Sequence, residues 1–420
     1  MNNATLKKDH STLAGELHIS GSKSISNRVL IMAELSGKPI EEFDFENLSE
    51  ADDTLRLQYY LELIRSCSLQ RLPLVINAEN AGTVMRFLSS FLTIKAGNWL
   101  LTGSSRMKNR PIEILADALR ELGADITYTE KTGYPPLLIK GVELAGGTLE
   151  LDASVSSQFI SSLMMIAPVT GKGMHLRFSE KPVSFPYIVM TKKLMERFGV
   201  AVELDTHSVK VNPSRYRIKD MAIEPDWSSA SYWYEAAALA DEADILLRGF
   251  SEDSVQGDSR VQKIFEELGV QTTAEENGIR LTKSGKTTAR FTYDFSDVPD
   301  LVPAVLTTCA ALHIPADISG VDHLKHKESD RMQALGNELS KIGAQITEEK
   351  GTYHLRMKKK ASGSKDLVFA TYDDHRMAMS FAPLVLKYGQ IVIENKDVVE
   401  KSYPAYWNDL EQLKIVHSIS

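Results

Sequence analysis

The chain has 420 residues, of which 43% are hydrophobic and 25% charged, so it is long enough for two or more globular domains and too apolar to be disordered. The formal net charge is −8 and the sequence pI about 5.8. This balance argues against general binding to nucleic acid or to an anionic membrane, because both attract a basic surface, and any anion site must therefore be local.

The start of the sequence and its cysteines predict a cytoplasmic protein. MNNATLKKDH lacks the apolar core of a signal peptide. No uninterrupted apolar run of about 18 residues occurs, so no membrane span is expected. Cys67 and Cys309 lie in apolar stretches without the spacing of a metal site, which indicates buried thiols in a reducing compartment.

The first candidate site is the run GSKSISNR, which precedes a helix that we expect to begin at Ile25. Lys23 and Arg28 supply cationic donors, and the three serines of the run can cap the helix. A helix N-terminus offers unpaired N–H groups and the positive end of a dipole, so this run can hold an anion. Simple capping with exposed cations is the alternative.

A second candidate helix start is NAGTVMRFLSSFL, where Gly82 and Thr83 open the helix and Arg86 lies one turn on. Backbone N–H groups, a hydroxyl and a guanidinium can converge there on one anion. The loop LTGSSRMKNRPI follows, with three close cations and with Pro111 in the expected first turn of a further helix. Such cations repel one another unless water or an anion screens them. A capped helix and a solvated loop are the alternatives.

Neutral hydrogen-bond donors mark the next two helix starts. SVSSQFISSLMMIAP places Ser156, Ser157 and Gln158 at the mouth of an apolar helix, and KPVSFPYIVM places Ser184 and Tyr187 near another. Hydroxyls and amides can bind phosphate at a smaller desolvation cost than further charges. For each segment, capping alone is the alternative.

Charged residues also precede helices in the C-terminal half. Asp297 and Asp300 stand before the apolar helix in FSDVPDLVPAVL, where capping and general-base work are the alternatives. In HKESDRMQAL, helical spacing predicts Lys327 and Arg331 on one face beside Glu328. A surface ion-pair face is the alternative there.

The last charged cluster is YDDHRMAMSF, where Asp374, His375 and Arg376 stand before a wholly apolar helix, and EKSYPAYW adds Lys401. Metal and nucleotide sites are not indicated. No HExxH or CxxC occurs, and SGKTT has Arg280 where a phosphate-binding loop needs glycine.

One pattern recurs along the chain: an amphipathic helix, a glycine corner and two short alternating strands. The corner glycines are Gly123, Gly199, Gly269 and Gly343. A repeat of about 70 residues is too long for a solenoid and predicts stacked α/β subdomains. Residues 51–77 lack such a glycine, so we expect one shortened subdomain there.

The clusters together predict a strongly positive cleft. Cationic or hydroxyl groups recur at helix N-termini in both halves of an acidic protein, which favours a substrate with several negative charges. Crossovers are expected near Gly21 and Asp226. They divide the chain into a substrate-binding domain at 21–225 and a second domain made of 1–20 and 226–420.

The motifs resemble those of the 5-enolpyruvylshikimate-3-phosphate (EPSP) synthase family of enolpyruvyl transferases. The resemblance extends over residues 13–410 and includes, in order, GSKSISNR, NAGTVMR, LTGSSRMKNRPI, SSQFISSLMMIAP, SFPY, DWSSAS, GDSRV, VPDLVPA, KESDRM, DHRMAM and EKSYPAYW. It implies an α/β fold of two domains, each with three βαβαββ subdomains and a cleft that closes on substrate. It also implies a monomer.

The resemblance implies a reaction of the shikimate pathway, which leads to chorismate and the aromatic amino acids. The enolpyruvyl group of phosphoenolpyruvate is transferred to the 5-hydroxyl of shikimate 3-phosphate, and phosphate is released without a metal or an organic cofactor. Sensitivity to the analogue glyphosate is expected because Gly82 leaves room beside the phosphate of phosphoenolpyruvate.

The resemblance also implies roles for particular residues. Shikimate 3-phosphate would be held by Lys23, Ser24, Arg28, Ser156, Ser157, Gln158, Ser184, Asp300 and Lys327. Phosphoenolpyruvate would be held by Lys23, Asn80, Gly82, Arg110, Gln158, Arg331, Arg376 and Lys401. The catalytic group would be Lys23, Asp300, Glu328, His375 and Lys401. We expect Glu328 to serve the methylene proton, and Asp300 and Lys23 to serve the hydroxyl and the departing phosphate.

Some positions depart from the family pattern. His323 stands where the family usually has Asn, and Ser20 replaces a common proline. The shortened stretch 51–77 is expected either to loosen the domain or to leave apolar surface exposed. Two rival functions remain. One is a transferase acting on a UDP-sugar, which typically has Lys-Asn in place of Lys23-Ser24. The other is a non-catalytic relative that binds phosphoanions.

Overall fold

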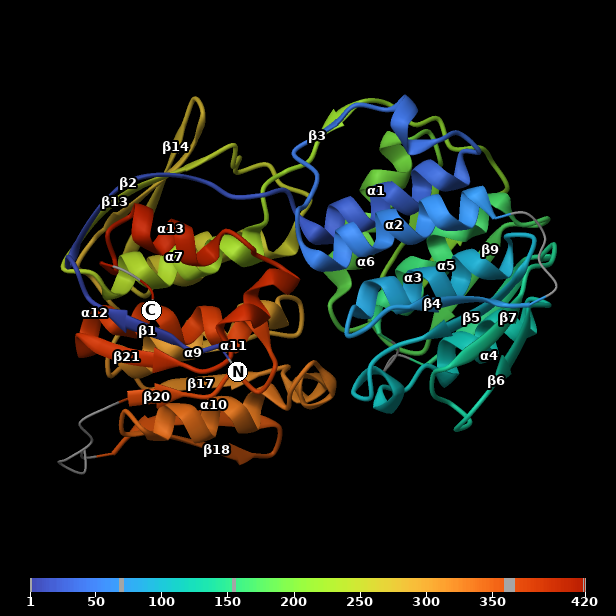
Figure 1. The fold of residues 1–420 in the computed structure, drawn as a ribbon. Helices are drawn as coiled ribbons and strands as arrows, with labels where there is room; N and C mark the ends of the chain where they lie inside the picture. Colours follow the sequence, from blue (N-terminus) through green and yellow to red (C-terminus); the bar gives the residue numbers. More distant parts are fainter. Residues whose placement is uncertain (1, 68–71, 153–155, 359–366, 418, 420) are drawn as a thin grey trace. The chain divides into compact units, whose positions relative to one another are not determined.

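The structure is a computed structural model that describes residues 2–67, 72–152, 156–358, 367–417 and 419. It divides into two compact units (Figure 1). Unit 1 comprises Met1–Ser20 and Glu224–Ser420, and unit 2 comprises Gly21–Ile223. The chain therefore passes between the units twice, after Ser20 and after Ile223.

Unit 2 contains two subdomains of the order βαβαββ. The first consists of β4 (Leu74–Asn77), α3 (Gly82–Thr93), β5 (Asn98–Thr102), α4 (Glu113–Glu121), β6 (Asp125–Tyr128) and β7 (Leu137–Lys140). The second consists of β8 (Gly147–Leu151), α5 (Ser157–Ile166), β9 (Met174–Phe178), α6 (Phe185–Arg197), β10 (Val202–Leu204) and β11 (Ser208–Val211). Their sheets have the strand orders β4-β5-β7-β6 and β10-β11-β9-β8.

The rest of unit 2 is a reduced version of this subdomain. It consists of α1 (Lys23–Leu35), β3 (Phe45–Glu46), α2 (Asp52–Ser66) and β12 (Met221–Ala222). Among the described residues its sheet is the parallel pair β12-β3. The stretch 51–77 forms α2 and β4, with residues 68–71 outside the described part. Its large apolar side chains that are more than half exposed are Leu55, Tyr59, Leu72 and Val75, which confirms the expected apolar surface.

Unit 1 repeats the arrangement around three sheets. The first subdomain consists of β2 (Thr12–His18), α7 (Trp227–Leu239), β13 (Glu242–Arg248), α8 (Val261–Glu266), β14 (Val270–Glu275) and β15 (Gly278–Lys283). The second consists of β16 (Phe291–Asp294), α9 (Val302–Ala311), β17 (Ala316–Ser319), α10 (Arg331–Ser340), β18 (Ala344–Glu349) and β19 (Thr352–Met357). Their strand orders are β14-β15-β13-β2 and β16-β17-β19-β18.

The two ends of the chain meet in the third sheet of unit 1. This subdomain consists of β20 (Leu367–Phe369), α11 (His375–Phe381), α12 (Val385–Tyr388), β21 (Gln390–Ile393), α13 (Tyr406–Gln412) and β1 (Ala4–Lys7). The order is β1-β21-β20, with β1 antiparallel and β20 parallel to β21. Segments from the start and the end of the sequence therefore stabilise one another.

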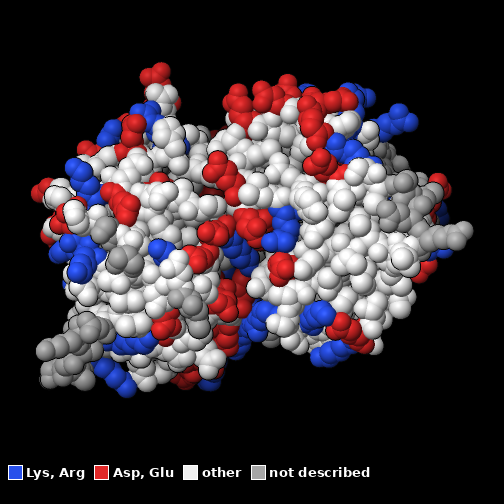
Figure 2. All heavy atoms as spheres, viewed as in Figure 1, with Lys and Arg blue, Asp and Glu red and all other residues white. Residues whose placement is uncertain are grey.

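Buried helices form the core of each unit. Every residue of α3 in unit 2 and of α9 in unit 1 is buried. Apart from Arg86 of α3, both helices carry apolar or small side chains on all faces, which is typical of a buried helix. Charged side chains of both signs are interspersed over the face drawn in Figure 2. No helix among the described residues is long and apolar enough to cross a membrane.

The corner glycines confirm the sequence repeat. Gly123, Gly199, Gly269 and Gly343 follow α4, α6, α8 and α10, and their φ angles lie between 81° and 101°. This left-handed backbone favours glycine at a helix C-terminus, because a Cβ would be strained there.

Some local predictions were wrong. Helix α1 begins at Lys23 rather than Ile25, and its N-cap residue Ser22 makes no side-chain capping bond. The hydroxyl of Ser26 instead accepts a hydrogen bond from the backbone N–H of Ser49, at 3.0 Å. Helix α4 begins two residues after Pro111. Cys309 is buried as expected, but Cys67 is only half-buried.

We predict that Gly21→Ala destabilises the protein by about 1–3 kcal/mol, the usual cost of overpacking. A Cβ at Gly21 would overlap the carbonyl oxygen of Asn47, which is backbone and cannot turn away. Gly336→Ala is the control, because its Cβ would meet nothing closer than 4.0 Å. Urea unfolding measures both variants, and equal stability of the two would contradict the prediction.

Candidate active site

The N-termini of four helices share one end of unit 2. Helices α1, α3, α5 and α6 pack against one another. Asn27 Nδ2 donates to Thr83 Oγ1 at 2.8 Å, Arg28 Nη2 to Ser161 Oγ at 3.0 Å, and Arg28 Nε to Thr191 Oγ1 at 2.7 Å. Each of these residues lies in the first two turns of its helix. The four positive dipole ends therefore lie together.

Arg28 fastens this end of unit 2. Its third guanidinium nitrogen donates to the Ser24 carbonyl at 2.8 Å, and its carbon lies 5.3 Å from the Phe87 ring and 5.8 Å from the Tyr187 ring. Burial lowers its pKa to about 10, so it remains a cation at neutral pH. Among the described residues no carboxylate pairs with it. Since all three nitrogens already donate, a substrate contact can use only their remaining N–H groups.

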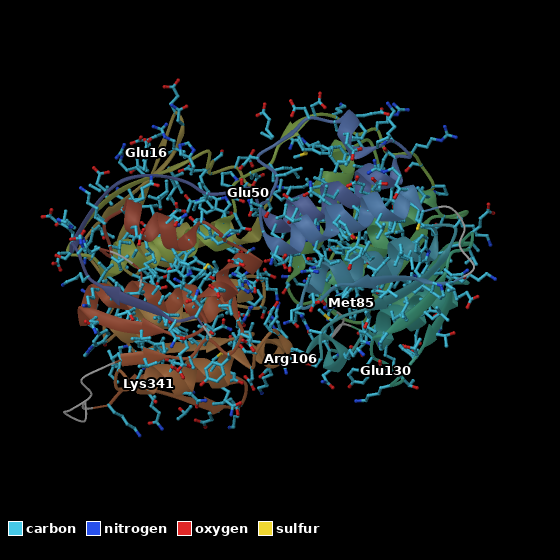
Figure 3. All side chains as sticks on the ribbon, viewed as in Figure 1. Glu16, Glu50, Met85, Arg106, Glu130 and Lys341 are labelled. Atoms are coloured by element: carbon cyan, nitrogen blue, oxygen red, sulfur yellow. The ribbon has the colours of Figure 1, made fainter. Side chains whose placement is uncertain are left out.

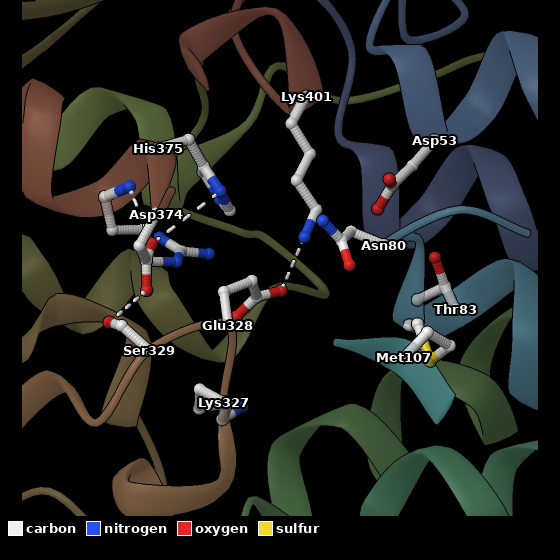
Figure 4. A network of polar contacts seen from close by, with 12 residues as sticks. Asp53, Asn80, Thr83, Met107, Lys327, Glu328, Ser329, Asp374, His375 and Lys401 are labelled. Carbon is white, nitrogen blue, oxygen red and sulfur yellow. Dashed lines mark hydrogen bonds and ion pairs between the residues drawn. The ribbon is translucent and has the colours of Figure 1, made fainter. Parts of the chain in front are cut away.

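Lys23, the first residue of α1, is paired with a buried acid. Its Nζ lies 3.1 Å from Asp53 Oδ2, and the Asp53 side chain is 4% exposed. Asp53, seen in Figure 4, belongs to α2, in the stretch that sequence reasoning had treated as merely shortened. The acidic start of an amphipathic helix was the signal that could have found it.

A second cationic group surrounds the start of α3. A Cβ added at Gly82 would stand 3.0 Å from Arg86 Nη1 and 3.3 Å from Arg110 Nη1, so both guanidiniums lie close to the backbone. Arg86 Nη1 donates to the Gly82 carbonyl at 3.2 Å. The Arg110 Nε is buried and has no hydrogen-bond partner among the described residues. Asn80 accepts a hydrogen bond from the Ser104 hydroxyl.

The serines predicted to hold a phosphate stand at the starts of α5 and α6. Ser156 caps α5 and accepts from the Gln158 N–H at 3.3 Å, and Ser157 is the buried first residue of the helix. Ser184 is the N-cap residue of α6 and has a left-handed φ of 56°, but its hydroxyl makes no capping bond. Hydroxyl donors and helix dipoles thus meet at one end of unit 2.

In unit 1 the central group is the Arg331 guanidinium, which contacts three carboxylates. The distances are 2.8 Å to Asp374, 2.9 Å to Asp300 and 3.0 Å to Glu328. Burial acts to lower the pKa of Arg331, but the three carboxylates outweigh it and raise that pKa. Only 1% of Arg331 is exposed, so the alternative of a surface ion-pair face is wrong.

Asp300 gathers the other cations of unit 1. Its Oδ2 accepts from Arg376 Nη2 at 2.9 Å, and its Oδ1 lies 3.9 Å from Lys327 Nζ. Burial acts to raise the pKa of Asp300, but Arg376, Lys327 and Arg331 hold it well below the usual range. Helix α10 begins at Arg331, so the expected shared helical face with Lys327 is wrong, and the two cations instead meet through Asp300.

Glu328 lies between two cations. Lys401 Nζ donates to its Oε1 at 2.9 Å, drawn as a dashed line in Figure 4, and Arg331 Nη2 donates to its Oε2 at 3.0 Å. Lys401 is the last residue of the 3-10 helix Lys396–Lys401. Tertiary structure thus brings together side chains that are far apart in the sequence.

Asp374 supports the site from within the core. It is fully buried, caps α11 through the Arg376 N–H at 3.0 Å, and accepts from the Ser329 hydroxyl at 3.0 Å. His375 is 2% exposed, with its Nδ1 3.8 Å from Asp374, so its ring is enclosed by protein. Sequence reasoning gave Asp374 no role, although its place before an apolar helix is typical of an N-cap.

Two titratable groups lie beside Asp300. Burial and the charge of Asp300 raise the pKa of Asp258 to about 7, while the Ser228 hydroxyl donates to Asp258. Burial and the charge of Lys327 lower the pKa of His323 to about 4, so this histidine is neutral at pH 7. Its Nε2 is buried without a hydrogen-bond partner in the described part of the chain.

No group of three or more His, Cys, Asp or Glu side chains among the described residues is placed to hold a metal ion. We call the polar groups at the helix starts of unit 2 and those at the helix starts of unit 1 the two polar clusters. They consist of organic cations, carboxylates, hydroxyls and backbone N–H groups.

A family model described as EPSP synthase (3-phosphoshikimate 1-carboxyvinyltransferase) matches residues 7–410. The chain belongs to this family. A Bacteroides fragilis 3-phosphoshikimate 1-carboxyvinyltransferase is 42% identical over 404 residues, covering 96% of each chain. The Sulfurovum relative of the same name is 34% identical over 434 residues, covering 98% of this chain and 99% of its own.

Solved structures agree on the fold. An EPSP synthase from Acinetobacter baumannii matches with a TM-score of 0.77 at 21% identity, covering 100% of this chain and 99% of its own. The resemblance found in the motifs is confirmed, and the family is the one that acts on 3-phosphoshikimate rather than on a UDP-sugar.

The raised pKa of Asp258 predicts a pH dependence of stability. An acid whose pKa is higher in the folded state stabilises the fold fully below its unfolded pKa of about 4, and this stabilisation is lost as pH rises through about 7. Between about pH 5.5 and pH 8 the unfolding free energy should therefore fall by about 2 kcal/mol through this group.

Urea unfolding at the two pH values tests this, with Asp258→Asn as the variant and Asp253→Asn, exposed in the preceding loop, as the control. The Asp258→Asn protein should lose that part of the pH dependence, and the control should keep it. A wild-type slope that survives Asp258→Asn would contradict the prediction.

Proposed function

We propose that this protein transfers the enolpyruvyl group of phosphoenolpyruvate to the 5-hydroxyl of shikimate 3-phosphate and releases phosphate. The observation that carries the proposal is that cations and hydroxyls gather at the shared N-terminal end of packed helices, once in each unit, in a protein of net charge −8. Both substrates carry several negative charges. The family membership supports the same reaction.

Unit 2 would supply the phosphate-binding groups. The hydroxyls of Ser156, Ser157 and Ser184 suit the phosphate of shikimate 3-phosphate, since neutral donors at helix ends are cheap to desolvate. The unpartnered Arg110 Nε and the backbone at Gly82 suit the phosphate of phosphoenolpyruvate.

Unit 1 would hold the carboxylate of phosphoenolpyruvate and the ring hydroxyls. Arg331 and Arg376 present guanidiniums, which bind carboxylates through paired N–H groups. Asp300 is ionised, so it can accept a hydrogen bond from a hydroxyl, and Lys327 lies beside it. Neutral His323 has an unpartnered ring nitrogen that can replace the amide usual at this position in the family.

The chemistry needs a proton at the methylene carbon while the hydroxyl oxygen bonds to the neighbouring carbon. Glu328, in its protonated form, would deliver that proton while the Asp300 carboxylate takes the proton of the hydroxyl, giving a tetrahedral intermediate with a methyl group. Lys401 would hold the Glu328 carboxyl group in place. The bond from the central carbon to the phosphate oxygen then breaks, a methyl proton returns to Glu328, and the proton taken up by Asp300 leaves with the phosphate. Lys23 and Arg110 would stabilise the charge on the departing phosphate.

The direct test is incubation with shikimate 3-phosphate and phosphoenolpyruvate while inorganic phosphate is measured. Release of phosphate is expected with this pair. Release with a UDP-sugar acceptor instead, or binding of both substrates without release, would replace the proposal with one of the two rival functions. The monomeric state and cytoplasmic location stay predictions.

We predict that Glu328→Gln lowers kcat by about 10²–10⁴-fold, the usual contribution of a general acid or base. The dissociation constants of both substrates should change little, because Gln keeps the shape of the side chain. Glu349→Gln, exposed on β18, is the matched control and should behave as wild type. A Glu328→Gln enzyme of near-normal turnover would refute the assignment.

We also predict that Gly82→Ala raises the KM for phosphoenolpyruvate and weakens inhibition by glyphosate. A Cβ there would press on Arg86 Nη1 at 3.0 Å and displace both guanidiniums by a few tenths of an ångström. The affinity for shikimate 3-phosphate should stay within about twofold, because the donors proposed for its phosphate are at the starts of α5 and α6. Steady-state kinetics measure all three quantities, and unchanged inhibition would count against the placement of Gly82.

A further inference from the structure

The residues before α11 form a turn with an unusual backbone. The Asp374 N–H donates to the Thr371 carbonyl at 2.9 Å, which closes a four-residue turn. Its two central residues, Tyr372 and Asp373, both have φ of 54°. Positive φ at both central positions defines the mirror-image turn that normally contains Asn and Gly. Neither residue is glycine here, so the turn is strained.

This turn leads directly into the polar cluster of unit 1. Its last residue, Asp374, binds the Arg331 guanidinium at 2.8 Å and caps α11. Arg376, two residues further on, binds Asp300 at 2.9 Å. Any relaxation of the turn would therefore move the carboxylate that orients Arg331 and the backbone that carries Arg376.

A buried glutamate of α10 holds the turn from one side. Glu338 is 2% exposed, and it accepts from the Tyr372 hydroxyl at 2.9 Å and from the Ala370 N–H at 2.9 Å. Lys341, labelled in Figure 3, neutralises Glu338 at 2.5 Å and also donates to the Val368 carbonyl at 2.7 Å. None of these contacts reaches the proposed substrate-binding groups. Glu338 and its partner Lys341 therefore stabilise the turn and the strand β20.

An asparagine holds the turn from the other side. Asn395 Nδ2 donates to Asp373 Oδ1 at 2.8 Å. Asn395 has a φ of 49° and is the N-cap residue of the 3-10 helix that ends at Lys401. The same side chain thus connects the turn before Arg376 to the helix that carries Lys401.

We propose that Glu338 and Asn395 are positioning residues, which hold the Thr371–Asp374 turn in its strained conformation and thereby keep Asp374 and Arg376 aligned for phosphoenolpyruvate. The proposal rests on the proposed function for the role of Arg376. A strained turn persists only where its surroundings determine it, and here Glu338 and Asn395 contact it from outside the proposed binding set. A longer contact of 3.4 Å joins Asn337 Nδ2 to the Tyr372 hydroxyl.

Two single variants each weaken the contacts that hold the turn. Glu338→Gln removes the negative charge and puts an NH2 group in place of either Oε1, which accepts from the Tyr372 hydroxyl, or Oε2, which accepts from the Ala370 N–H and from Lys341. Asn395→Gly removes the amide but keeps a residue that tolerates positive φ. Each should raise the KM for phosphoenolpyruvate by roughly five- to tenfold. Once the contact is lost, a left-handed residue of the turn can relax, and the free energy gained by that relaxation corresponds to a fold-change of this size. The dissociation constant of shikimate 3-phosphate should stay within about twofold.

The double variant Asn395→Gly with Asp373→Gly gives the sharper test. Glycine at 373 adopts positive φ without strain, so the turn no longer needs Asn395, and most of the KM increase should be reversed. Lys350→Gly is the matched control. Lys350 is a left-handed, exposed residue between β18 and β19 with a φ of 53°, and its replacement should leave KM unchanged.

The outcomes separate the two proposals. Circular dichroism and melting temperatures first establish which variants fold. If Glu338→Gln does not fold, the comparison of Asn395→Gly with the double variant tests the proposal. Unchanged KM in the folded single variants, or a double variant no better than Asn395→Gly, overturns the positioning role. An inactive wild type overturns the proposed function instead, and the inference is then tested by calorimetric binding of phosphoenolpyruvate to the same variants.

Discussion

One buried guanidinium, that of Arg331, joins three segments of unit 1 through carboxylates. Asp300 precedes α9, Glu328 precedes α10 and Asp374 caps α11, so a single cation neutralises the acids at three helix starts. Removing one member of such a buried group leaves a charge without its partner, at a cost of about 3–5 kcal/mol. The rest of the polar cluster of unit 1 depends on Arg331, because Arg376 and Lys401 are held by two of the carboxylates that Arg331 also binds.

In unit 2 the buried cations at the helix starts are stabilised in another way. Arg28 and Arg110 lie close to helix N-termini without a carboxylate partner in the described part of the chain. The charge of Arg28 is balanced by two hydroxyls, a carbonyl and two aromatic faces. In unit 1 an arriving carboxylate must instead share cations with Asp300 and Glu328. Guanidiniums without a carboxylate partner at helix starts suit phosphate binding, and carboxylates beside cations suit acid–base chemistry.

The repeated subdomain explains why sequence patterns located so many of these groups. In four of the copies a helix ends at a left-handed glycine, and in unit 2 the packed helices are joined by contacts between their first two turns. Clusters at successive helix starts in the sequence thereby become neighbours in space. The αL pair Tyr372 and Asp373 is the exception, because nothing in its composition announces a strained turn. Asp53 stands at the acidic start of α2, but its pairing with Lys23 could not be predicted because Lys23 belongs to a different helix.

The sequence alone determined the repeat, the family, and the helix starts near Gly82, Ser156 and Asp374, with the start of α1 misplaced from Lys23 to Ile25. These depend on local periodicity, on glycine at left-handed corners and on short motifs, which are all properties of neighbouring residues. Only the tertiary structure decided that Arg331 is buried rather than on a surface face, that Arg28 is committed to protein contacts, and that Glu338 and Asn395 hold a strained turn. The reason is physical: burial, charge compensation and backbone strain depend on partners brought together from distant parts of the chain, and no local pattern specifies them.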